Sequence, residues 1–186
     1  ANGTLVKHWT AEPGFWGPRG IAVGTDGNVY VTDTGNKRIV AFNADGVQIE
    51  YWGSDGSAPG QLIEPVGIAI NQHNEVVVCD TGNRRIQVFQ SDGVFAREFP
   101  VYGWEEFYTE PYIALQGDSA YVTDSYMHRF ARYDEAKLTG VWGKTGSGNG
   151  EFNRPIGIAV APDGRVAVSD TLNNRIQIFQ PPAPAS

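Results

Sequence analysis

The chain is built from one unit that occurs four times. Each unit carries an aspartate at the end of a run of β-branched residues and an arginine five positions later. The intervals between successive aspartates are 47, 44 and 46 residues, and the arginines follow the same intervals; the pairs are Asp33 and Arg38, Asp80 and Arg85, Asp124 and Arg129, and Asp170 and Arg175. A period in this range is typical of solenoids and propellers. The chain therefore has to be interpreted as an array of repeats.

Within a unit, short apolar segments alternate with turns, as the first unit illustrates. Residues 20–23 follow a proline, and the pair Asp26-Gly27, which tolerates the positive φ of a hairpin turn, separates them from residues 29–32. Residues 39–42 and 47–52 form a second pair of segments around another turn. No unit shows a helical period. The pattern predicts an all-β fold, a β-propeller of four-stranded antiparallel blades with four blades in this chain.

The units resemble the NHL repeat. The residues that carry the resemblance are Pro-x-Gly-Ile-Ala-Val followed by Asp-Gly-x-Val-Tyr-Val-x-Asp-Thr-Gly-Asn-x-Arg-Ile, and the match covers essentially the whole chain. The arrangement is also similar to NHL regions attached to large bacterial and archaeal membrane proteins. The resemblance implies the propeller fold. It leaves the function open, because the family includes protein-binding and RNA-binding modules, hydrolases, lyases and extracellular bacterial domains.

The two ends of the chain complement each other. Residues 3–9 align with residues 46–52 and predict a fourth strand, whereas the last unit ends after a third strand at Phe179. We expect the N-terminal strand to close the last blade, which would remove exposed sheet edges. Because NHL propellers usually have six blades, a fragment of a larger ring and half of an assembled ring are the alternatives. A single domain is expected over residues 1–180, followed by a Pro/Ala-rich tail over residues 181–186.

Composition narrows the classes of partner. The formal net charge is -7, from 14 basic and 21 acidic residues, and it opposes a phosphate backbone, so nucleic acid is a disfavoured partner. We expect no membrane-spanning helix, because no run of about 18 apolar residues occurs, and no secretory signal in the first residues. Cys79 is the only cysteine and stands where other units have threonine or serine, so it is interpreted as a small strand residue.

The repeated Asp and Arg residues are interpreted as structural pairs, because all four units have both, whereas one substrate needs one site. An arginine can bind a carboxylate of its own or the next blade. The alternative is a ring of carboxylates that binds a cation in a central channel. The three histidines, His8, His73 and His128, share no metal-ligand spacing. We therefore expect no catalytic residue, no metal and no cofactor.

The third unit breaks the symmetry. Residues 100–110 place aromatic and acidic residues where other units have glycine and serine, and Ser-Tyr-Met-His replaces the Thr-Gly-Asn type of loop at residues 125–128. Aromatic side chains suit binding surfaces because they offer a large contact area at modest entropy cost. The alternative is that they fill space against a neighbouring blade. The candidate ligand-binding residues are Tyr102, Trp104, Phe107, Tyr108, Tyr112, Tyr126 and His128.

These observations favour a non-catalytic propeller scaffold that binds a protein, peptide or glycan through its loops. We expect it to be a module of a larger bacterial protein, extracytoplasmic or attached to a membrane through that parent protein. Two alternatives remain, a metal-assisted hydrolase or lyase of NHL-propeller type and an RNA-binding NHL module. The sequence does not fix the oligomeric state.

Overall fold

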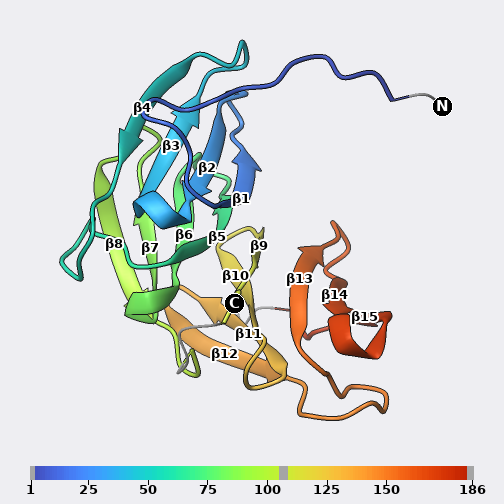
Figure 1. The fold of residues 1–186 in the computed structure, drawn as a ribbon. Helices are drawn as coiled ribbons and strands as arrows, with labels where there is room; N and C mark the ends of the chain where they lie inside the picture. Colours follow the sequence, from blue (N-terminus) through green and yellow to red (C-terminus); the bar gives the residue numbers. More distant parts are fainter. Residues whose placement is uncertain (1–2, 105–108, 184–186) are drawn as a thin grey trace.

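The computed structural model describes residues 3–104 and 109–183. In this range the chain forms four antiparallel sheets, and its only helices are three short 3-10 turns, none of them long or apolar enough to cross a membrane. The sheets follow one another around a common centre, and β1, β5, β9 and β13 are the innermost strands (Figure 1). The expected all-β propeller with four blades in this chain is confirmed.

The blades are meanders in which each strand pairs with the next. The strands of the first blade are β1 (Pro18–Val23), β2 (Val29–Asp33), β3 (Arg38–Phe42) and β4 (Gln48–Trp52). Those of the second are β5 (Pro65–Ile70), β6 (Val76–Asp80), β7 (Arg85–Phe89) and β8 (Phe95–Pro100). Those of the third are β9 (Ile113–Gln116), β10 (Ser119–Asp124), β11 (Arg129–Asp134) and β12 (Lys137–Trp142). Those of the fourth are β13 (Pro155–Val160), β14 (Val166–Asp170) and β15 (Arg175–Phe179).

The loop between the second and third strands has the same form in three blades. The 3-10 turns η1 (Thr34–Asn36), η2 (Thr81–Asn83) and η3 (Thr171–Asn173) occupy it in the first, second and fourth blades. Each turn is followed by a residue in the left-handed region. These turns lie at the end of the molecule where the inner strands begin, and we call that end the loop face. The third blade has a turn without a 3-10 helix at residues 125–128.

The innermost strand of the third blade lacks a bulge that the innermost strands of the other three blades have. In the first, second and fourth blades the register shifts between the opening proline and the isoleucine three positions on. Gly20 lies in the first of these bulges, and a Cβ there would sit 2.4 Å from the carbonyl oxygen of Val66 in the next blade. Only glycine permits that approach. The third blade has one residue fewer at this point, and β9 pairs with β10 without a shift.

The hydrophobic cores lie between adjacent blades. One core joins the first and second blades around Tyr30, Leu62 and Phe89, another joins the second and third around Trp104, and a third joins the third and fourth around Phe152. A small cluster on the free side of the first blade contains Phe42, against which Trp9 packs with ring centroids 5.7 Å apart. Most of the buried apolar side chains therefore lie between blades, where they hold adjacent sheets together.

The predicted closure of the last blade by the N-terminal strand is not formed in this structure. The fourth sheet has three strands, and residues 3–9 are in no strand. Trp9 is held by the first blade, and the segment before it extends past that blade at the top of the view, apart from β15 in the lower part (Figure 1), with Leu5 and Val6 exposed. The outer strand β15 keeps an open edge with Ile176 and Ile178 exposed. Closure therefore stays a prediction.

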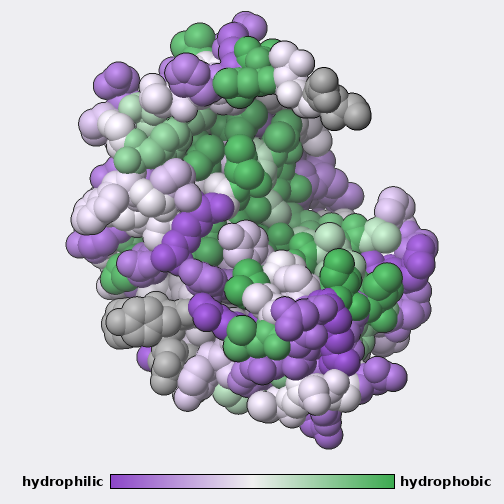
Figure 2. Space-filling model, turned by 45° about the vertical axis from the view of Figure 1, so that its right-hand side comes forward, coloured by the Kyte–Doolittle hydropathy of each residue, from purple (hydrophilic) through white to green (hydrophobic). Residues whose placement is uncertain are grey.

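Apolar surface is exposed where closure would bury it. Ile21 and Val23 of β1 are exposed, and a hollow of about 590 Å³ beside them is lined by Trp9, Phe15 and Phe42. Figure 2 shows hydrophobic residues along the hollow between the upper and lower parts of the molecule. At the other end, Pro181 is buried and the carbonyl oxygen of Pro182 accepts a hydrogen bond from Arg132 of the third blade. The start of the expected tail thus lies against the array.

Candidate binding site

The four Asp and Arg pairs lie within their own blades, at the end of the second strand and the start of the third. The distances from arginine Nε to the carboxylate are 2.8 Å for Arg38 and Asp33, 2.8 Å for Arg85 and Asp80, 3.2 Å for Arg129 and Asp124, and 2.7 Å for Arg175 and Asp170. All four aspartates are buried. Because every carboxylate faces its own guanidinium, the pairs do not form a common ring of cation ligands.

Each pair fastens the loop that enters its blade. In the second blade, Oδ1 of Asp80 accepts the Ile63 N–H at 2.8 Å, and Arg85 donates to the carbonyl oxygens of Ser57, Ala58 and Gln61. Asp170 and Arg175 bind the corresponding loop of the fourth blade in the same way. The buried pair thus replaces water as the partner of loop backbone groups, as buried polar groups require.

The third blade lacks one hydrogen bond that the others share. Asn36, Asn83 and Asn173 donate their side-chain amide to the aspartate of their blade, but Met127 occupies that position in the third. Burial raises the pKa of Asp124, and the hydrogen bonds from Met127 N–H and Arg129 offset it only in part. Burial also acts on Asp170, but hydrogen bonds from Asn153, Asn173 and Arg175 outweigh it and lower the pKa.

The aromatic candidates of the third unit do not form one patch. Trp104 is 1% exposed, donates its indole N–H to the carbonyl oxygen of Thr123, and packs in the core between the second and third blades. It occupies the place that Leu62 and Phe152 have in their loops. For Trp104 the structure selects burial over an exposed binding face. Phe107 and Tyr108 lie outside the described residues.

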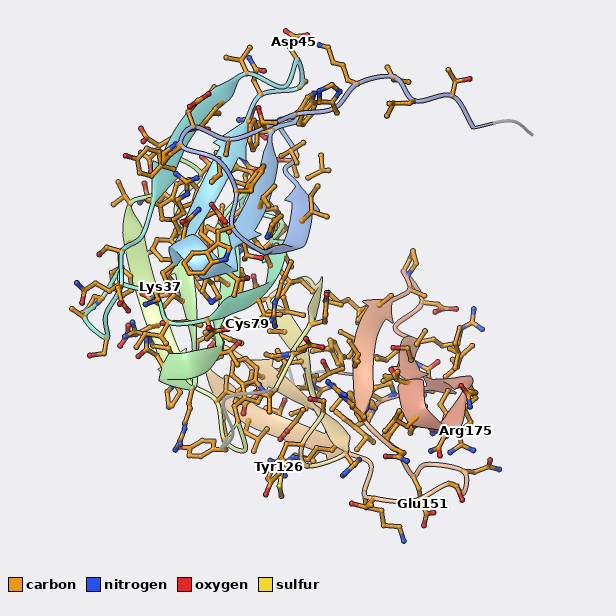
Figure 3. The ribbon with its side chains drawn as sticks, viewed as in Figure 1. Lys37, Asp45, Cys79, Tyr126, Glu151 and Arg175 are labelled. Carbon is orange, nitrogen blue, oxygen red and sulfur yellow. The ribbon has the colours of Figure 1, made fainter. Side chains whose placement is uncertain are left out.

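The other candidates lie nearer the surface. Tyr102 is exposed, and its backbone N–H donates to the buried Tyr133 hydroxyl. Tyr112 is half-buried, with its backbone N–H bonded to Thr123 Oγ1 at 2.9 Å. Tyr126 is exposed at the tip of the third blade's loop (Figure 3). His128 is half-buried, and its Nδ1 accepts the Arg154 N–H at 3.0 Å.

Tyr126 and His128 line a pocket on the loop face between the third and fourth blades. Its volume is about 340 Å³, and the other lining residues are Thr109, Ser125, Asn153, Arg154 and Leu172. Volumes of this order are usual for ligand pockets. The structure therefore brings together two of the seven candidates at one described cavity, Tyr126 and His128.

Three residues of the fourth unit complete the pocket and were not predicted, namely Asn153, Arg154 and Leu172. Leu172 is exposed and stands where the first two blades have Gly35 and Gly82. Its backbone N–H still makes the hydrogen bond of that position, to the Asn153 carbonyl oxygen at 3.0 Å, so only the side chain is new. Arg154 has a φ of 57°, and its guanidinium lies 3.8 Å from Glu110. The replacement of glycine by leucine was the available signal for Leu172.

Glu110 connects blades across the centre of the loop face. Its carboxylate lies 3.4 Å from Arg19 of the first blade and 3.8 Å from Arg154, which precedes β13 of the fourth. All three side chains are partly exposed, so each contact contributes little to stability. Of the two guanidinium groups that Glu110 contacts, that of Arg154 lines the pocket between Tyr126 and Leu172.

Among residues 3–104 and 109–183, no group of three or more His, Cys, Asp or Glu side chains is arranged to hold a metal ion. Cys79 is buried inside the second blade (Figure 3), and burial raises the pKa of its thiol, so it is not an activated nucleophile. His73 lies on the opposite end of the molecule from His128, at the turn before β6, 3.6 Å from Asp118.

The blades, their shared cores and the fourfold Asp and Arg pairs define this chain as a β-propeller. The model of the NHL repeat matches residues 15–42, 62–89 and 152–179, so three segments of this propeller are NHL repeats. These matched segments come from the first, second and fourth units. The unit between them, with its altered loop, lies outside the matched segments.

Known proteins show the same fold. The chain is 50% identical to "Protein lin-41" of Caenorhabditis elegans over 56 residues, which are 28% of this chain and 5% of that protein. Virginiamycin B lyase from Staphylococcus aureus has a similar structure, with a TM-score of 0.59 and 19% identity over 88% of this chain and 55% of that one. A gluconolactonase from Xanthomonas campestris gives a TM-score of 0.62 and 16% identity over 90% of this chain and 59% of that one. At these identities the likeness concerns the fold, and this chain spans little more than half of either solved structure.

Proposed function

We propose that the chain is a binding module whose loop face, at the third and fourth blades, recognises a partner protein or peptide. The observation that carries the proposal is the pocket between Tyr126 and Leu172. Both residues stand where the first two blades have glycine, and both project an exposed side chain while the Asp and Arg pair of each blade is retained.

The chemistry of this pocket suits an apolar side chain of a peptide. Tyr126, Met127 and Leu172 are each at least 43% exposed, and such side chains bury a large area at small entropy cost when a partner covers them. Asn153 and Arg154 line the same cavity and supply polar groups that can orient a peptide backbone. A pocket with an apolar wall and a few polar groups is the usual form of a recognition site.

The first two blades show what the loop is without this specialisation. A Cβ at Gly35 would meet Trp16 at 2.5 Å, and one at Gly82 would meet Ile63 at 2.3 Å, so these loops are tucked against the preceding segment. At the equivalent positions the third and fourth blades lack that close packing and instead expose the side chains of Tyr126 and Leu172 to solvent. In the proposed role, the module serves a larger extracytoplasmic or membrane-attached protein.

A loop exchange tests the proposal. In the variant Tyr126→Gly/Met127→Asn the third loop takes the Gly-Asn pair of the first two blades, so the fold should be kept. Wild-type protein is screened against a random peptide display library and a glycan array, and enriched ligands are titrated into both proteins. We expect peptides with an apolar residue to be enriched and to bind the variant roughly tenfold more weakly, the loss expected for one or two anchor side chains.

Three results would overturn this assignment. Equal affinity of the selected peptides for wild type and variant would move the site away from the third loop. Turnover of a lactone or of a streptogramin by the wild-type protein, lost in the variant, would instead support the alternative of a hydrolase or lyase. Enrichment on the glycan array alone would assign the same pocket to a sugar.

A further inference from the structure

A repeated pair of aromatic residues fills the interfaces between blades. Between the first and second blades, Tyr30 and Trp52 pack edge to face at 6.1 Å, and Trp52 lies 6.0 Å from Phe89 of the next blade. Between the third and fourth blades, Tyr121 and Trp142 occupy the equivalent strand positions in a shared core. Each pair consists of a tyrosine in the second strand and a tryptophan that ends the fourth.

The interface between the second and third blades has smaller residues at both positions. Val77 stands where the other two interfaces have Tyr30 and Tyr121, and Phe99 stands where they have Trp52 and Trp142. Phe99 reaches Tyr133 of the third blade, with ring centroids 5.7 Å apart, but neither it nor Val77 has the length of its counterparts. Close packing is the rule in protein interiors, so two reductions in one interface leave space unless neighbours move in.

The neighbouring hairpin does not move in. In the second blade, the turn at Gly93 lies against Trp52, where a Cβ would be 2.7 Å from the indole ring. In the third blade the corresponding hairpin is a short turn through Glu135 and Ala136, both with positive φ. A groove of about 400 Å³ remains, and Val77, Val88, Phe99, Leu115, Ala120 and Tyr133 provide its apolar walls.

The opening of this groove is acidic. Four carboxylates line it, from Glu75, Glu98, Asp118 and Glu135, together with the guanidinium of Arg97 and the imidazole of His73. Arg97 is held by Glu75 through two contacts of 2.7 Å, and Glu98 is held by Arg85 at 2.8 Å. Asp118 and Glu135 add further negative charge at the rim, which favours a cation at the mouth of the groove.

We propose that this groove is a second binding site, separate from the loop face, and that it takes an aromatic ring carrying or adjoining a positive charge. The ring occupies the space that the Tyr and Trp side chains fill at the other two interfaces, and the charge lies among the carboxylates at the opening. Two sources share this chemistry, a free arylalkylamine and an aromatic residue next to a basic residue in a peptide.

The decisive variant restores the missing ring. Phe99→Trp fills the groove with the residue that ends the first and third blades, and Val77→Tyr does so from the second strand. Binding of tryptamine is measured by calorimetry with wild type and both variants, and thermal unfolding is followed alongside. We expect saturable binding of tryptamine to wild type. Phe99→Trp should bind tryptamine at least about tenfold more weakly than wild type does, because the indole side chain takes the ligand's place. The unfolding temperatures of the variants should be at or above that of wild type, because the added ring fills the groove.

Ligand charge and ligand source are varied separately. Indole-3-propionate has the same ring with a negative charge and should bind more weakly than tryptamine; Asp118→Asn/Glu135→Gln should weaken tryptamine by roughly three- to fivefold but leave neutral indole unchanged. An acetylated Lys-Trp amide tests the peptide source, and stronger binding than tryptamine assigns the site to a peptide.

Failure of tryptamine and of the dipeptide to saturate, or equal binding by Phe99→Trp, would overturn the proposal. Tyr126→Gly/Met127→Asn should bind tryptamine as wild type does, which separates this site from the loop face.

Discussion

The hydroxyl of Thr32 in the first blade donates to the carbonyl oxygen of Val66 in the second at 2.8 Å. The hydroxyl oxygen of Thr32 also accepts the Gly20 N–H of its own blade at 2.7 Å, so one side chain joins two inner strands. Thr123 repeats the arrangement with Ile156 and Tyr112. At the equivalent place Cys79 has a thiol, which forms weaker hydrogen bonds than a hydroxyl.

Thr32→Val should destabilise the protein, because it keeps the shape of the side chain and removes the hydroxyl. The buried Gly20 N–H and Val66 carbonyl oxygen then lose a partner, and such losses cost about 1–3 kcal/mol each at most. We expect a lower free energy of unfolding in urea, by about 1–3 kcal/mol. Thr25→Val is the matched control, because the Thr25 hydroxyl also bonds the second blade, at Asn74, but is exposed; an equal loss in both variants would show that burial of the Thr32 hydroxyl has no special role.

Met127→Asn should stabilise the third blade. The new amide can donate to Asp124 as Asn36 donates to Asp33 at 2.8 Å, and a hydrogen bond to a charged group contributes about 1.5–3 kcal/mol at best. Urea unfolding measures the gain. Asn83→Met makes the reverse change in the second blade and should lose a similar amount. A loss of stability in Met127→Asn together with a gain in Asn83→Met would show that Met127 is itself a packing residue.

Asp124 and Asp170 should respond to pH in opposite directions. The raised pKa of Asp124 means that its contribution to stability is present below the usual value of 3.8 and is lost as the pH rises through the folded pKa. The lowered pKa of Asp170 means that its contribution is present above 3.8 and is lost as the pH falls through the folded pKa. The free energy of unfolding of Asp124→Asn and of Asp170→Asn, each compared with that of wild type across acid pH, measures the contribution of each carboxyl group to stability.

In that series, the stability of Asp124→Asn relative to wild type should rise with pH. The deficit of Asp170→Asn should shrink as the pH falls, because wild type then loses the term that the variant already lacks. Changes in the same direction for both variants would contradict the assignment of the two carboxyl groups.

Arg38→Met should be among the most damaging single changes. It leaves the carboxylate of Asp33 buried without a counter-charge, which costs about 3–5 kcal/mol. Adding Asp33→Asn removes the unpaired charge and should recover part of the loss. Arg129→Met is expected to cost less, because Arg129 is more exposed and its contact with Asp124 is longer, at 3.2 Å. Thermal and urea unfolding of the four proteins provide the comparison.

The sequence determined the blades well because the repeat itself carries the signal. The Asp and Arg residues recur at the strand ends where the structure pairs them, and the strand segments were visible as alternating apolar runs. It predicted the individual aromatics of the third unit less well. Trp104 enters the core between two blades as Phe152 does in its own loop. The sequence did not show this likeness, because other aromatic residues surround Trp104 and because burial depends on how a loop returns to the core.

Features that depend on two blades at once were missed. Leu172 and Arg154 belong to the fourth unit, and only the packing of that unit beside the third brings them to Tyr126 and His128. The groove at Phe99 likewise results from residues of two blades that are each unremarkable alone. The predicted pairing of residues 3–9 with β15 stays a prediction, because strand pairing also requires the end blades to approach, and the fourth sheet of this structure has three strands.

The central claim is that the loop face at the third and fourth blades binds the partner. The most direct test is the backbone amide spectrum of the isotopically labelled protein during titration with a peptide selected on it. The account predicts shift changes concentrated at residues 125–128, 153–154 and 172, with the equivalent loops at residues 34–37 and 81–84 unchanged. Shift changes at those first two loops, or spread evenly over all four blades, would contradict it.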